Sequence, residues 1–450
     1  MALGRRGRGD AADAYAPEPT MAIYATAFAQ ENMPPPPPDG GYGWFCVLAQ
    51  FLINGFTWGV AASYSVYLAH YLSHDIFPEA SSVDYAFIGG FNFAFALLSA
   101  PLATLLIRIG GARTPMLLGA ILLPLGFASA SFAIRVWHLY LSQGLCVGVG
   151  IGLIYIPATA IIPQWFDKKR SLANGISAAG SGIGGLSLCF SAQVMLDTVG
   201  LALTLRITAV IVFVVNLSAT IVMRSRNREI KPDMHLLKLH LLSSYQVRLL
   251  LAWSVVIMFG YMTLMFSLSD YALAIGRSRQ NSATVAAVLN LGAAIGRPLI
   301  GYLSDRMGRV VVAGSATFAT GILVFALWLP TTEYGLLIPF ALISGAILGI
   351  FWAAIGPLAA DMVDLKELTA LLTIVWLSVA APSACAEAIA LQLRHSDFGP
   401  RSYTYAQIFA GVSYVAASGI MLELWRVRRA AERIMQSNLP HGGDIRGSSP

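Results

Sequence analysis

The sequence predicts an all-α polytopic membrane protein with twelve transmembrane helices in two six-helix halves. Of its 450 residues, 56% are hydrophobic and only 12% are charged, whereas an ordinary soluble domain carries about 25% charged residues. Apolar runs of about 20 or more residues recur along the chain, and each is long enough to cross a bilayer. The runs are continuous rather than alternating, which favours helices over a β-barrel.

Twelve such runs flank a basic loop at 224–246, six on each side. The first half, 44–223, contains runs at 44–72, 83–107, 114–134, 138–162, 171–195 and 202–223. The second half, 247–425, contains runs at 247–275, 283–303, 309–329, 335–357, 368–392 and 402–425. The N-terminal tail, 1–43, is predicted to be disordered and includes a proline run that favours a stiff polyproline II spacer. The C-terminal tail is 426–450.

Lysine and arginine set the expected orientation. They are concentrated in both tails and in the loops that lie on the same side as the tails. Since cytoplasmic loops are enriched in these residues, both termini are predicted to be cytoplasmic, and we expect the plasma membrane. The net charge of +6 is then explained by orientation and by contact with anionic lipid headgroups, so no nucleic acid partner is expected.

Several classes of function find no support in the residues. The sequence has no nucleotide-binding loop, no metal-ligand cluster and no Ser/His/Asp pattern, which argues against an enzyme, a metal site or a cofactor. The four cysteines lie in apolar segments without a CxxC pair and are interpreted as small apolar residues. Residues 1–43 lack the apolar stretch of a cleavable signal peptide.

Arg297 lies inside the apolar run 284–303. A charged side chain at the centre of a bilayer costs about 2.5–3.5 kcal/mol on insertion scales, so it should face a cavity or an anionic partner. The planar guanidinium suits bidentate binding of a carboxylate. We therefore predict that Arg297 binds an anionic group of the substrate. The alternative is a structural ion pair with Glu387 or Asp270.

Further polar or aromatic residues within the spans are candidates to line the same cavity. Any one of them can equally serve helix–helix hydrogen bonding or packing. As a group they predict an amphipathic substrate pocket. They are Asn54, Tyr64, Tyr155, Tyr261, Asn290 and Trp352.

The segment from Gly301 to Arg309 follows the eighth span. Its glycines permit close helix approach and a tight turn, and its aspartate can pair with arginines or cap a helix. The pattern G-x-x-x-D-R-x-G-R resembles a loop of the major facilitator superfamily, whose two halves rock about a midplane site. The resemblance implies gating roles for Gly301, Asp305, Arg306, Gly308 and Arg309. The matching loop at 108–113 lacks the aspartate.

Two other segments are similar to the signatures of the monocarboxylate porter family. The first runs from Asp39 to Trp44 and resembles D-G-G-[WY]-G-W; the second runs from Trp165 to Gly175 and resembles [YF]-F-x-K-R-R-x-x-A-x-G. The chain is thus identified as a member of this family, with a resemblance over about residues 39–425. The signature residues are Asp39, Gly40, Gly41, Trp44, Phe166, Lys168, Lys169, Arg170 and Gly175.

The resemblance implies that Arg297 matches the eighth-helix arginine that binds the substrate carboxylate. The lactate carriers of the family also have a lysine in the first span and an aspartate one turn before that arginine. This chain has Ala62 and Ala293 at those positions, so proton–lactate symport is not implied. Glu387 and Asp270 are the candidates for proton coupling, since a carboxyl group in an apolar bundle has a raised pKa.

We therefore predict a secondary active or facilitative transporter that moves a small organic acid or carboxylate-bearing metabolite by alternating access. Two alternatives stay open: an exporter of a larger secondary metabolite and, from another class, a transporter-like nutrient receptor. The expected partners are a small organic anion, the lipid bilayer and protons as a candidate co-substrate. The coupling ion, the direction of flux and any accessory subunit stay open.

Overall fold

The computed structural model describes residues 36–232, 238–395, 399 and 401–437, and every regular element among them is helical. The first half contains α2 (Gly43–Phe56), α3 (Trp58–Ser73), α4 (Ser82–Leu98), α5 (Ala100–Gly110), α6 (Arg113–Ala130), α7 (Val136–Leu139), the π-helical turn η1 (Tyr140–Cys146), α8 (Val147–Trp165), α9 (Arg170–Val199) and α10 (Leu201–Val222). A short helix α11 (Asn227–Ile230) and the 3₁₀ turn η2 (Leu239–Ser243) lie in the connecting loop. The second half contains α12 (Tyr245–Ala274), α13 (Arg279–Met307), α14 (Arg309–Leu323), the π turn η3 (Val324–Trp328), α15 (Tyr334–Leu348), α16 (Ile350–Ala360), α17 (Leu368–Gln392) and α18 (Thr404–Ser437).

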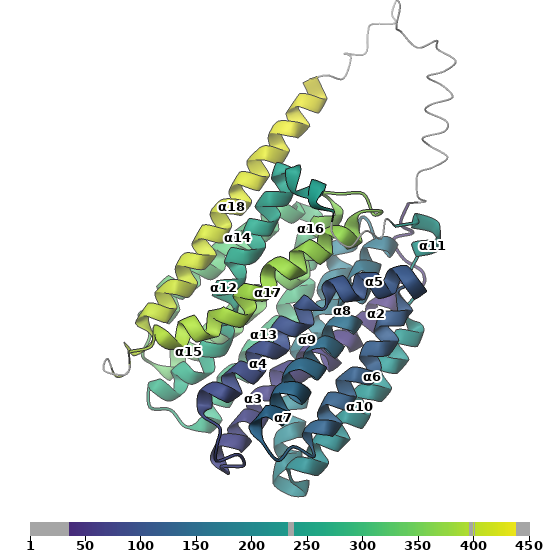
Figure 1. Cartoon of the computed structure of the whole chain (residues 1–450). Coiled ribbons are helices and arrows are strands. Elements are labelled where there is room, and N and C mark those ends of the chain that lie inside the picture. The colour runs from purple at the N-terminus through teal and green to yellow at the C-terminus, as the bar shows by residue number, and fades with distance from the viewer. Residues whose placement is uncertain (1–35, 233–237, 396–398, 400, 438–450) are drawn as a thin grey trace, which may run out of the picture.

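The twelve predicted spans are confirmed. Twelve helices of the described residues are long and apolar enough to cross a membrane, and most begin and end within a few residues of the predicted positions. The last span differs, because α18 continues to Ser437 rather than ending at 425. Figure 1 shows it projecting beyond the rest of the bundle. Most of the disordered tail predicted at 1–43 lies outside the described residues.

Three spans are interrupted near their middle. The second span breaks at Ser99, between α4 and α5. The first span breaks at Thr57, between α2 and α3, where the hydroxyl of Thr57 donates to the carbonyl of Ile53. The tenth span breaks at Gly349, between α15 and α16. A break leaves helix-end groups exposed, which is tolerated at membrane depth only where the backbone is buried in protein or lines a cavity. The residues at all three breaks are buried, so the breaks lie inside the bundle.

The two halves lie side by side, with the first half in purple to teal and the second in green to yellow (Figure 1). They meet where α9 packs against α13 and where α4 packs against α17. The backbones of α9 and α13 approach so closely that a Cβ on Gly175 would lie 2.4 Å from the carbonyl oxygen of Arg297. A Cβ on Gly301 would lie equally close to the carbonyl oxygen of Ser171. Small residues of this kind let membrane helices pack tightly.

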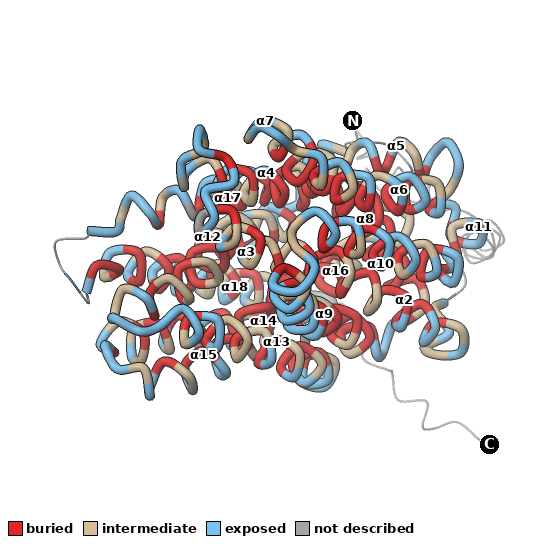
Figure 2. Tube along the Cα trace, turned by 90° about the horizontal axis from the view of Figure 1, so that it is seen from below, coloured by how far each residue is buried: buried red, intermediate tan, exposed pale blue. Residues whose placement is uncertain are grey.

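Burial separates an interior from an apolar exterior. Buried residues occupy the inside of each half, while exposed segments run around the outside (Figure 2). Many exposed residues are large and apolar, such as Phe190, which is 73% exposed, and Ile295, which is 61% exposed. Such a surface is stable in contact with lipid tails. The arrangement leaves the contact between the halves as the place for a polar site.

Candidate functional site

A cavity lies between the two halves, beside the helix breaks of the first and tenth spans. Its cavity volume is about 50 Å³, several times the 10–15 Å³ that one water molecule needs. Residues from α2, α3, α4 and α9 line it from one half, and residues from α12, α13, α15 and α16 line it from the other. Its lining includes Asn54, Trp58, Ala62, Phe93, Ser181, Tyr261, Asn290, Ala293, Arg297, Gly349 and Trp352.

Arg297 projects from α13 into this cavity and is only 6% exposed. Its Nη1 donates to the carbonyl of Ala178, 2.6 Å away, and to the hydroxyl of Ser181, both on α9. Its Nε is buried and has no hydrogen-bond partner. Among the described residues, neither bond of Arg297 goes to a carboxylate. The guanidinium is thus held in place from the opposite half, and no described carboxylate offsets its charge.

Gly349 makes room for this guanidinium. A Cβ at position 349 would lie 2.4 Å from Nε and 2.9 Å from Nη2 of Arg297. The break between α15 and α16 therefore brings a backbone without a side chain against the arginine. Sequence reasoning missed Gly349, because nothing in the chain marks which span packs against Arg297. It also missed Trp58 and Ser181, which are ordinary residues for a membrane helix.

Aromatic rings surround the rest of the cavity. The Trp58 ring lies 5.2 Å from that of Trp352 and 5.1 Å from that of Phe93. The Tyr261 ring lies 6.0 Å from that of Trp352. Such distances are typical of favourable ring pairs. Two of these rings come from each half, so the aromatic wall spans the contact between the halves.

The predicted substrate residues fall into two groups. Asn54, Tyr261, Asn290, Arg297 and Trp352 line the cavity together. Tyr155 stands behind the lining: its ring meets the Trp58 ring edge-on at 5.3 Å and lies 6.2 Å from the Trp352 ring. The Tyr64 hydroxyl donates to the carbonyl of Tyr85 and is not part of the lining.

Acidic groups are absent from the described lining of the cavity. Ala62 and Ala293, where the lactate carriers have lysine and aspartate, both line it. Asp270 lies elsewhere, 3.0 Å from Arg394 and bonded by the Tyr403 hydroxyl. Burial and the bond to this carboxylate raise the pKa of the Tyr403 phenol, which therefore stays a neutral donor. Glu387 lies in α17, and its side chain is outside the described residues.

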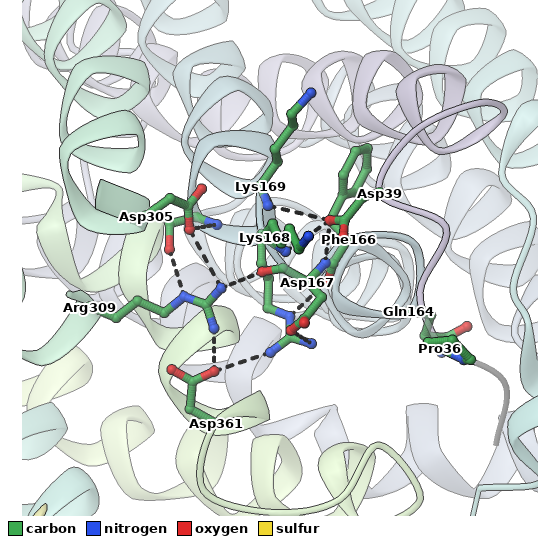
Figure 3. Close-up of polar contacts among 12 residues, drawn as sticks. Pro36, Asp39, Gln164, Phe166, Asp167, Lys168, Lys169, Asp305, Arg309 and Asp361 are labelled. Carbon is green, nitrogen blue, oxygen red and sulfur yellow. Dashed lines mark hydrogen bonds and ion pairs between the residues drawn. The ribbon is translucent and has the colours of Figure 1, made fainter. Parts of the chain in front are cut away.

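Asp39 joins the two family signatures at the end of the bundle where α2 begins and α18 ends, here called the terminal face. Its Oδ1 accepts from the backbone N–H groups of Asp167, Lys168 and Lys169, at 2.7, 2.9 and 3.4 Å (Figure 3). The Trp44 ring also meets the Phe166 ring edge-on at 5.0 Å. The carboxylate thus fixes the turn that precedes α9 by satisfying its backbone donors.

Asp361, at the end of α16, connects the halves across the same face. Its carboxylate pairs with Arg170 of α9 at 3.1 Å and with Arg309 of α14 (Figure 3). Arg428 of α18 stands 3.8 Å away. Asp305 accepts from the backbone N–H groups of Ser171 and Leu172, at the N-terminus of α9, where a carboxylate is favourable. We call Arg170, Asp305, Arg309, Asp361 and Arg428 the terminal latch.

The predicted gating residues contribute unequally to this latch. Asp305 and Arg309 belong to it, Gly301 packs against Ser171, and Gly308 ends α13 at a φ of 100° that favours glycine. Arg306 instead stands over the ring of Tyr302, 4.6 Å from its centroid. Sequence reasoning missed Asp361. The available signal was a carboxylate just past the tenth span, but Asp364 and Glu367 follow closely and share it.

Comparison with known proteins identifies the family. The model of the Major Facilitator Superfamily matches residues 46–386 and 250–441. The chain belongs to the major facilitator superfamily. This transporter is 34% identical over 396 residues to the Probable transporter MCH2 of Saccharomyces cerevisiae, across 87% of this chain and 83% of that protein. It is 30% identical to the Monocarboxylate transporter 11 of Mus musculus, across 70% and 72% of the two chains.

The fold is similar to that of solved transporters. The crystal structure of a variant of the E. coli fucose:proton symporter FucP matches with a TM-score of 0.65 at 12% identity, over 84% of this chain and 99% of that chain. These findings confirm the all-α twelve-helix fold and the relation to monocarboxylate transporters. The protein is a multi-pass membrane transporter of a small molecule and not an enzyme.

Proposed function

We propose that this transporter carries a small organic acid and that Arg297 binds the substrate carboxylate. The observation that carries the proposal is a buried guanidinium that lines the cavity and has no carboxylate partner among the described residues, with Nε left unbonded. An unpaired buried donor on a charged group costs more than the 1–3 kcal/mol of a neutral one. A carboxylate that enters the cavity would satisfy the donor and the charge together.

Alternating access requires the contacts that join the two halves at one face to break and re-form. The terminal latch joins α9 of one half to α14 and α16 of the other. Opening this face requires the Arg170–Asp361 pair and the bonds from Ser171 and Leu172 to Asp305 to break. The positive residues of this face support its assignment to the cytoplasmic side, with both termini inside and the plasma membrane as the location. The described conformation is then closed toward the cytoplasm.

A second candidate function is export of an organic anion. The described lining of the cavity has no acidic side chain that could carry a proton together with the substrate. A substrate carboxylate would then cross the membrane as an anion. A membrane potential is worth about 2.3 kcal/mol per elementary charge per 100 mV, and a negative interior drives anions outward. The larger secondary metabolite of the sequence prediction remains a candidate cargo. Symport through Asp270 or Glu387 is the competing prediction.

Reconstituted vesicles test the function. Purified protein should give saturable flux of an organic acid, whereas a nutrient receptor would bind without moving it. Arg297→Gln should abolish that flux with reconstitution unchanged, and normal flux in this variant would remove Arg297 from the mechanism. Imposing a potassium–valinomycin potential and, separately, a pH gradient distinguishes charge-driven from proton-coupled transport. Asp270→Asn should leave the potential-driven flux intact.

A further inference from the structure

We infer that the cavity selects an aromatic monocarboxylate over a short aliphatic one and over an amino acid of the same carbon skeleton. This inference rests on the proposed function, because it assumes that Arg297 binds the carboxylate. It adds two requirements that a carboxylate site alone does not impose. The body of the substrate should be a flat ring, and the substrate should carry no ammonium group.

The ring requirement comes from the walls. Trp58, Phe93, Tyr261 and Trp352 all line the cavity and are each less than 9% exposed. A second layer supports them, since Trp376 stacks on Trp352 at 5.9 Å and 16°. Rings that only packed together would leave no space between them, yet these border an open volume next to Arg297. A substrate ring in this volume would have aromatic neighbours from both halves, and aromatic pairs are favourable beyond the apolar area that they bury.

Unpaired donors point the same way. The indole N–H groups of Trp58 and Trp352 are buried without an acceptor, like Nε of Arg297. The amide N–H groups of Asn54 and Asn290 instead donate to carbonyls of their own helices, at Gln50 and Ala286. All three side chains with unpaired donors belong to the cavity lining, and a carboxylate in the cavity would bring two acceptor oxygens close to them.

The charge of the lining excludes an ammonium group. Arg297 contributes a positive charge to the lining, and Ala62 and Ala293 contribute none. Among the described residues that line the cavity there is no aspartate or glutamate. An amino acid would place its ammonium group beside the guanidinium with no anion of the protein to offset it, and like charges at short range repel strongly where the dielectric constant is low.

Four probes separate these requirements. Propionate and 3-phenylpropionate differ by the ring, phenylalanine adds only the ammonium group, and 3-phenylpropionamide replaces the carboxylate by a neutral amide. Affinities would be measured by isothermal titration calorimetry on the purified full chain. We expect 3-phenylpropionate to bind about tenfold more tightly than each of the other three probes, a difference of about 1.4 kcal/mol.

Variants assign the preference to residues. Trp352→Leu should lower the affinity for 3-phenylpropionate about tenfold and change that for propionate little, whereas general misfolding would lower both. Phe93→Leu provides a second lining variant if Trp352→Leu fails to fold. Trp425→Leu, a tryptophan substitution in α18 away from the cavity lining, is the matched control and should change neither affinity.

The outcomes separate the two levels of the argument. Equal affinities for propionate and 3-phenylpropionate, both lost in Arg297→Gln, would overturn the ring requirement and leave the proposed function standing. Phenylalanine binding as tightly as 3-phenylpropionate would overturn the exclusion of ammonium. Binding of the two acids that survives Arg297→Gln, or no binding of either, would overturn both the inference and the proposed function.

Discussion

The contact between Gly349 and Arg297 gives the sharpest test of the site. In Gly349→Ala, the new Cβ would lie 2.4 Å from Nε, about 1 Å closer than the 3.4 Å at which ordinary contacts begin. The guanidinium must therefore move by roughly 1 Å, and misplacing a positioned group by that much can cost about 100-fold. We expect the affinity for an organic acid to fall about tenfold to 100-fold.

The fold should tolerate the same substitution. Gly349 has a φ of −78°, which alanine adopts without strain, and a glycine-to-alanine change at a compatible position stabilises by about 0.4–1 kcal/mol. Only the flexible end of Arg297 has to yield. Gly356→Ala, in the same helix α16, is the matched control, because its Cβ would meet nothing closer than 3.8 Å.

Calorimetric titration and thermal unfolding of the two variants check both statements. Gly349→Ala should lose affinity at an unchanged or slightly raised melting temperature, and Gly356→Ala should keep its affinity with a similar effect on the melting temperature. Unchanged affinity in Gly349→Ala would show that the position of the Arg297 guanidinium does not control binding. A loss of equal size in the control would show that α16 responds to any added methyl group.

Three further predictions follow from the same contacts. Asp361→Asn leaves the buried Arg170 without its partner from the other half. We expect the free energy of unfolding to fall by roughly 1–3 kcal/mol, less than the 3–5 kcal/mol that breaking a fully buried pair costs. Hydrogen exchange in the first turn of α9 should become faster, and Asp364→Asn should show no such change. Ala293→Asp places a carboxylate one turn from Arg297, so anion binding should weaken at neutral pH and recover as the pH falls and the aspartate is protonated; a pH-independent affinity would contradict this. Arg297→Lys keeps the charge but loses the planar fork, and it should bind the substrate at least about tenfold more weakly in the same titration.

Hydropathy predicted the spans because crossing a bilayer demands long apolar helices, whatever their neighbours are. It could not locate the end of α18. Arg426 and Arg428 look like the start of a tail, but the helix continues through them, and Arg428 approaches Asp361 of another helix. That contact depends on which helices are neighbours in the fold, and the local composition of the sequence does not predict this.

The candidate site divides in the same way. Arg297 stood out because a cation in an apolar run needs a reason, and it does line the cavity. Trp58 and Tyr155 are alike as aromatic residues of a span, yet only Trp58 reaches the cavity. Gly349 matters because it has no Cβ, which leaves room for the Arg297 guanidinium. Such distinctions come from the packing of the halves, which a single sequence does not encode position by position.

The glycine contacts between α9 and α13 have a consequence for how such a transporter can change its cargo. Gly175 meets the carbonyl of Arg297 and Gly301 meets that of Ser171, so the joint between the halves is built from backbone atoms. Side chains that face the cavity from these helices can be replaced without altering the joint. Evolution or design could therefore change the substrate preference of the pocket and keep the contact between the two halves. Gly175 and Gly301 are the positions to leave unchanged.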